Sequence, residues 1–126
     1  MAESRFEPVP FPDIPFAADV RAYCLDLPDA WEDYPWGDIV FKVGTKLFAG
    51  VSTESPLTVT VKATPEDAEE LLEYPHISTA PYVGRYGWVS VAIEDEATLD
   101  QALALIEMSY ELVRKGSRAR RGRKEP

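Results

Sequence analysis

Hydrophobic and polar residues alternate most regularly between residues 39 and 62, where β-branched and aromatic side chains are interrupted only by turn-forming positions. A period of two is the pattern of a strand that buries one face. Gly44-Thr45 can close a first hairpin and residues 53–56 a second, because glycine tolerates positive φ and proline is excluded from a central strand. This stretch therefore predicts three antiparallel strands.

The same alternation assigns the side chains of these strands to two faces. One set is apolar and is expected to face a core: Ile39, Phe41, Val43, Leu47, Ala49, Val51, Leu57, Val59 and Val61. The other set is mixed and is expected on the outer face: Val40, Lys42, Lys46, Phe48, Thr58, Thr60 and Lys62. Because only one face is consistently apolar, helices are expected to cover a single side of the sheet.

Segments with helical periodicity flank the strands. Apolar residues recur on one side from about Phe16 to Leu25, and a longer amphipathic stripe runs from Leu99 to Val113. Between them, Thr64 followed by Pro65 is typical of a helix start, since threonine caps the first turn and proline is preorganised there. The sequence therefore predicts three helices.

Further signals surround the last helix. Thr98 and Gln101 have the spacing of a capping box at its start, and Gly116 is expected to end it. A strand at 88–93 and a short one at Tyr82-Val83 are expected before it. With the first three, they bring the predicted total to five strands.

These elements predict an α+β fold: a two-layer domain in which a five-stranded antiparallel sheet has its helices packed on one face. The first and last helices are expected to share that face. Leu103 and Ile106 should then be buried against Phe41 and Val59.

The chain is expected to form one domain, since 126 residues with 45% hydrophobic content can bury a single core. Residues 1–15 are rich in proline and predict an extended arm whose apolar residues lie along the domain. Residues 16–115 form the predicted domain, and residues 116–126 are expected to be a basic, disordered tail.

Few residues are available for chemistry. Cys24 is the only cysteine and is expected to be a small buried hydrophobe on the first helix. His76 is the only histidine and is expected in an exposed loop, so no metal site is predicted. There is no phosphate-binding glycine loop or nucleophile elbow, and neighbouring carboxylates are typical of solvated surfaces. We therefore expect a protein without enzymatic activity or cofactor.

The compartment is inferred from what the sequence lacks. A single cysteine fits a reducing environment. No apolar run approaches the roughly 18 residues of a membrane span, and the first residues have no signal-peptide core. A cytoplasmic protein that is neither exported nor inserted in a membrane is expected.

Charge divides unevenly along the chain. Residues 114–126 contain seven basic residues and one acid, a charge of +6, whereas residues 1–113 carry −15, for a total of −9. The acidic body repels phosphate at long range, although a local basic patch can act within the Debye length of about 8 Å. The basic tail can be interpreted as solvated, as contacting nucleic acid, or as folded back onto the acidic body.

The alternation of side chains along the strands places several cations on the predicted outer face. Three of the six basic residues among the first 113 fall there, and aromatic and hydroxyl side chains fall beside them. Such groups suit an anionic ligand such as nucleic acid, through charge-assisted hydrogen bonds and stacking. The alternative is that the lysines only deter edge pairing. The candidates for this face and its neighbouring turn are Lys42, Lys46, Phe48, Lys62, Arg85 and Trp88.

Residues 28–38 combine turn-forming residues with unusual aromatic area. Trp31, Tyr34 and Trp36 can cap an open end of the core, or they can form a wall that faces a ligand. Tyr34 and Trp36 are therefore additional candidates for a binding site.

An ordered series of short motifs resembles the MmcQ/YjbR-like family over about residues 17–115. The series consists of Tyr34-Pro35-Trp36-Gly37, Val43-Gly44-Thr45-Lys46-Leu47-Phe48-Ala49, Lys62, Ala80-Pro81-Tyr82, Gly87-Trp88 and Ser109-Tyr110-Glu111-Leu112-Val113. The resemblance implies a two-layer α+β domain, similar in outline to type III secretion chaperones. The family is often described as DNA-binding and has no assigned enzymatic activity, so the resemblance also implies a DNA-binding protein that is not an enzyme. The family commonly has phenylalanine at the position of Trp36.

Two functions remain open from the sequence. The first is a small binding domain for DNA or another anionic ligand, using the lysine and aromatic sheet face and the basic tail. The second is a protein-interaction or homodimerisation module that uses the open sheet face and the acidic body.

Overall fold

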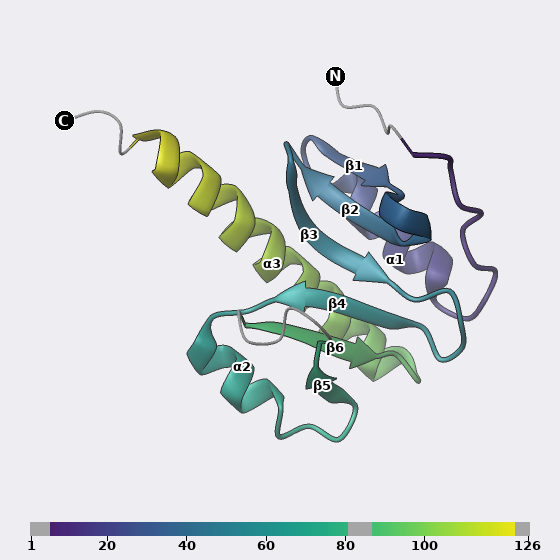
Figure 1. Ribbon diagram of the computed structural model, residues 1–126. Helices are drawn as coiled ribbons and strands as arrows, with labels where there is room; N and C mark the ends of the chain where they lie inside the picture. The colour runs from purple at the N-terminus through teal and green to yellow at the C-terminus, as the bar shows by residue number, and fades with distance from the viewer. Residues whose placement is uncertain (1–5, 81–86, 123–126) are drawn as a thin grey trace.

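The computed structural model describes residues 6–80 and 87–122, with side chains described as far as residue 115 (Figure 1). Its elements form one antiparallel sheet and three α-helices, which confirms the predicted α+β class. In Figure 1 the α1 and α3 helices lie behind the sheet, and the other face of the sheet carries no α-helix. The domain therefore has the two layers expected from a sheet with one apolar face.

The sheet has six strands where five were expected, in the order β1-β2-β3-β4-β6-β5. All neighbouring pairs are antiparallel. One additional strand forms within the aromatic segment, and another follows His76. The predicted strand at Tyr82-Val83 lies outside the described residues. The strands are β1 (Ala30–Asp33), β2 (Ile39–Val43), β3 (Lys46–Val51), β4 (Thr58–Lys62), β5 (Ile77–Thr79) and β6 (Trp88–Ala92).

The helices follow the predicted pattern with altered ends. They are α1 (Ala17–Asp26), α2 (Pro65–Leu71) and α3 (Glu96–Gly122), with a short 3₁₀ turn η1 (Pro35–Gly37) after β1. Thr64 caps α2 as expected, because its Oγ1 accepts a hydrogen bond of 3.1 Å from the backbone N–H of Asp67.

The start of α3 differs from the predicted capping box. Asp95 is the capping residue: its Oδ1 accepts from the Thr98 backbone N–H at 2.8 Å, and Thr98 Oγ1 accepts from the Asp95 N–H at 3.0 Å. Thr98 is therefore the reciprocal partner rather than the cap. Gln101 instead contacts His76, which is half-buried with Nε2 2.6 Å from Gln101 Oε1. The expectation that His76 is exposed is wrong.

The predicted end of the last helix is also wrong. The α3 helix passes through Gly116 and continues to Gly122. A glycine inside a helix costs only about 1 kcal/mol, so it does not by itself stop a long helix. The backbone of 117–122 is therefore helical where a disordered tail was expected.

One core joins the sheet to the helices and the arm. Phe41, Val59 and Ile106 are buried in this core, as predicted, whereas Leu103 packs against it only partly buried. Phe11 of the proline-rich arm also packs there, with its ring centroid 6.3 Å from that of Phe41. The arm therefore lies along the domain over the residues that the structure describes.

A β-bulge in β3 changes the predicted faces of the strand. Phe41 pairs with Ala49 and Lys42 pairs with Leu47, so Phe48 is an extra residue without a partner on β2. Phe48 is 0% exposed and its ring meets that of Tyr110 edge-on at 5.3 Å. The prediction that Phe48 lies on the outer face is wrong, because Phe48 is the inserted residue and turns toward the core. The β3 residues that precede it lie on the opposite faces from those predicted.

Ser109 of α3 occupies the place where the bulge interrupts the sheet. The β3–β4 ladder ends at Ala49 opposite Val61, so Phe48 and Lys62 would form the next pair. Instead, the buried Ser109 hydroxyl donates to the Phe48 carbonyl at 2.6 Å and accepts from the Lys62 N–H at 2.9 Å. One side chain thus satisfies two backbone groups that the separated strands leave open.

We predict that Ser109→Ala lowers the free energy of unfolding by about 2–3 kcal/mol, because it leaves a carbonyl and an N–H without partners in the interior. Urea denaturation measures this change. Ser78→Ala, at an exposed position of β5, should change stability by no more than about 0.5 kcal/mol. Equal effects of the two substitutions would contradict the bridging role of Ser109.

Candidate anion-binding surface

The outer face of the sheet retains only part of the predicted set of residues. Lys62 pairs with Trp88 across β4 and β6, and directly opposed residues point to the same face. Next to them, Thr60 Oγ1 and Ser90 Oγ are 3.2 Å apart. A lysine, an indole and two hydroxyls are therefore adjacent on this side of the sheet, as predicted.

Lys42 lies on the outer face but is engaged by an acid. Its Nζ is 2.7 Å from Oδ2 of Asp33, whose side chain is only 4% exposed, and 5.4 Å from the centre of the Trp31 ring. A buried carboxylate without its cation is strongly unfavourable, so Lys42 is needed where it is. Its contribution to an anion site is accordingly small.

Lys46 lies on the opposite face from the one predicted. It pairs with Val43, which packs against the core on the helix-bearing side. Leu47, predicted to face the core, takes the outer position opposite Lys42. The bulge at Phe48 causes both reversals. Arg85 lies outside the described residues.

The aromatic candidates have separate environments. The Trp31 indole N–H donates to the Gly44 carbonyl at 2.9 Å and so attaches β1 to the β2–β3 turn. Tyr34 is half-buried and its hydroxyl donates to Glu32 at 2.8 Å; burial and this hydrogen bond raise the pKa of Tyr34. The two residues therefore serve the fold, which favours the capping interpretation for them.

Trp36 is 88% exposed, and its only ring neighbour in the described part of the chain is Phe6, edge-on at 5.5 Å. Its φ of 55° is in the left-handed region, which costs a residue with a side chain about 1–2 kcal/mol. Neither core packing nor a relaxed backbone accounts for this position. Trp36 therefore stays a candidate contact residue.

Cations gather at one end of the sheet rather than across its outer face. In Figure 1 the β2–β3 turn, the end of β4 and the outgoing half of α3 lie at the same end of the molecule. They carry Lys46, Lys62, Arg114 and Lys115, and the helix continues with further basic residues to 122. We refer to these four residues and residues 116–122 as the basic end.

The cations of the basic end differ from the others in their partners. Arg21 is paired with Glu32 at 2.8 Å, and Lys42 is paired with Asp33. Lys46 and Lys62 form no ion pair within the described residues, and Arg114 pairs with the half-exposed Glu111 at 3.2 Å. A partly exposed pair of this kind contributes little, so these charges are available to an external anion.

Other kinds of site find no support in the described residues. Across 6–80 and 87–122, no group of three or more His, Cys, Asp or Glu side chains could hold a metal ion. Within the same residues, no helix is long and apolar enough to cross a membrane.

An open antiparallel sheet backed by a long C-terminal helix makes this a two-layer α+β domain. The sequence pattern of the YjbR family matches residues 25–112, and the chain belongs to this family. This confirms the resemblance found from the motifs.

Solved structures that are similar to this chain include two from bacteria. A Deinococcus radiodurans protein with a DUF419 domain has 31% sequence identity and a TM-score of 0.69, with 76% of each chain covered. A Pseudomonas syringae protein has 20% identity and a TM-score of 0.62, covering 76% of this chain and 97% of its own, which shows a shared fold. No match was found among curated proteins.

Cys24 is fully buried, as predicted, and burial raises the pKa of its thiol to about 12. We predict that at pH 8 a thiol reagent modifies the native protein roughly 1,000-fold more slowly than the urea-unfolded chain, whose thiol has an ordinary pKa near 8.5. Because the folded pKa is the higher one, this group should also make the fold less stable as pH rises above about 8.5. Similar modification rates in the two states would contradict the buried placement.

Proposed function

We propose that this protein is a non-enzymatic domain that binds nucleic acid through its basic end, with Trp88 and the hydroxyls of the adjacent sheet face as secondary contacts. The observation that carries the proposal is the separation of paired from unpaired cations. Lys46 and Lys62 have no acidic partner among the described residues, and both lie where the basic half of α3 leaves the sheet.

The charge distribution supports a local contact rather than a broad one. Residues 1–113 carry −15, so most of the surface repels phosphate. The basic end collects positive charge at one end of the sheet, and each cation there acts on a phosphate within the Debye length of about 8 Å in physiological salt. A basic helix beside two lysines suits a phosphate backbone.

The sheet residues beside Lys62 support a contact with unpaired bases. Trp88 is half-buried and pairs with Lys62, so a ring and a cation are presented together. Base stacking on an aromatic ring contributes about 1–3 kcal/mol per base and tolerates any sequence. We therefore expect single strands to bind at least as well as duplexes of equal length.

Fluorescence anisotropy with a labelled single strand and a labelled duplex tests the proposal across a salt series. We predict that replacing both Lys46 and Lys62 by glutamine reduces the steepness of the log–log salt dependence by about one for each lysine. Truncation after Lys115 should reduce it further.

Arg21→Gln is a control outside the basic end: it removes one positive charge from α1, its effect is compared per charge with that of the lysine double variant, and circular dichroism checks that it stays folded without its pair to Glu32. It should leave the salt dependence unchanged. The proposal is wrong if neither oligonucleotide binds at low salt, or if the lysine double variant and Arg21→Gln have the same effect.

A further inference from the structure

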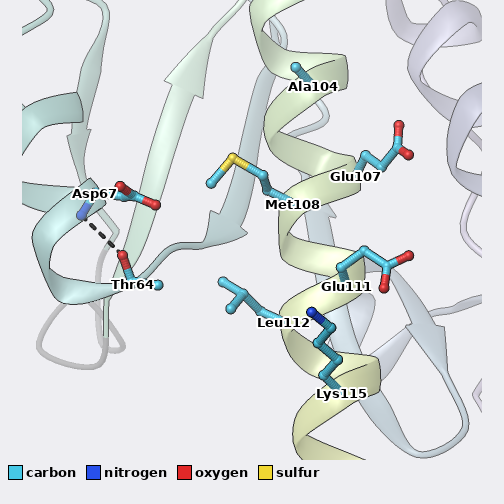
Figure 2. A pocket seen from close by; sticks show the side chains of 8 residues that line it. All are labelled: Thr64, Asp67, Ala104, Glu107, Met108, Glu111, Leu112 and Lys115. Carbon is cyan, nitrogen blue, oxygen red and sulfur yellow. Dashed lines mark hydrogen bonds between the residues drawn. The ribbon is translucent and has the colours of Figure 1, made fainter.

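A groove runs between the start of α2 and the exposed side of α3 (Figure 2). It has a volume of about 440 Å³, and Figure 2 shows the side chains of Met108 and Leu112 directed from α3 toward Thr64 and Asp67. Met108 is 38% exposed although it is a large apolar side chain. The groove is lined by Thr64, Asp67, Ala104, Glu107, Met108, Glu111, Leu112 and Lys115.

Three of the residues that line this groove are acidic, Asp67 of α2 and Glu107 and Glu111 of α3, and one, Lys115, is basic. The α2 helix has four carboxylates and no basic residue, and α3 between 96 and 113 likewise has four carboxylates and no basic residue. Glu107 accepts a hydrogen bond from the Tyr23 hydroxyl of α1. An apolar floor whose lining carries more acids than bases suits a basic, helical occupant.

The second half of α3 has the opposite character. Residues 114–122 contain five basic residues and no acid, and Figure 1 shows the last turns of α3 extending beyond the sheet. Like charges three or four residues apart disfavour an isolated helix, and Gly116 disfavours it by about 1 kcal/mol more. A helix with this composition is stabilised when an acidic surface covers it.

We propose that the groove receives residues 114–122 of a second copy of this chain, so that two α3 helices pack antiparallel in a symmetric dimer. Antiparallel pairing centred at the level of Val113 places Glu111 of each copy opposite Lys115 of the other, and Met108 opposite residue 118. The contact is isologous, because each copy supplies one acidic groove and one basic helix. The dimer uses the same basic helix that the proposed function assigns to nucleic acid, so the two contacts compete, and the dimer is tested with no nucleic acid present.

Variants that reverse the charges of the groove or of the helix test this dimer, with the mass measured by light scattering. The salt concentration is about 0.15 M, where the Debye length of about 8 Å screens repulsion between the acidic bodies but preserves close ion pairs. The groove variant is Asp67→Lys with Glu111→Lys, one residue from each wall. The helix variant is Arg118→Glu with Arg121→Glu. We expect the wild type to dimerise from its 14.1 kDa monomer, and each variant alone to be monomeric.

Mixing the two variants should restore a dimer, since each basic helix then meets an acidic groove and each acidic helix meets a basic groove. Glu73→Lys with Glu94→Lys, both exposed and outside the groove, makes the same change in net charge and should stay dimeric. Circular dichroism confirms folding of every variant. A wild type that is monomeric at all concentrations, a helix variant that still dimerises, or an equimolar mixture that stays monomeric would each overturn the proposal.

Discussion

The fold depends on one buried hydroxyl that connects three elements. Ser109 donates to the Phe48 carbonyl and accepts from the Lys62 N–H, so α3 replaces the rung that is missing where β3 leaves β4. Only a group that both donates and accepts can do this without leaving a buried backbone group unsatisfied. The next residue, Tyr110, adds a second attachment by donating to the Pro28 carbonyl at 2.7 Å.

The same bridge determines which surface the protein can use. Because Phe48 turns inward at the bulge, its ring packs on Tyr110, and Lys46 is placed on the helix-bearing side near the end of the sheet. Lys62, whose N–H the bridge holds, lies at that end as well. The binding surface that we propose therefore lies at the end of the sheet, where α3 emerges, and not in the middle of the outer face.

Local patterns in the sequence predicted the local features of the fold. Alternation located β2, β3 and β4, periodicity located α1 and α3, and Thr64 was identified as a cap, because each of these depends on neighbouring residues. The bulge could not be predicted, since Phe48 and Ser109 are 61 residues apart and strand parity assumes an unbroken ladder. The Lys42–Asp33 pair was missed for a related reason: it requires β1, which forms within residues 28–38, where no strand was predicted.

Amide hydrogen exchange at Lys62 tests the central role of Ser109 most directly. In the wild type, the Lys62 N–H should be as protected as the neighbouring N–H groups within β4, because it donates to a buried hydroxyl. In Ser109→Ala, protection at Lys62 should fall by roughly 100-fold relative to the wild type, and further than at Val59, which lies within the intact ladder. Equal protection of Lys62 in the two proteins would contradict the account, because the strand would then hold its place without the helix.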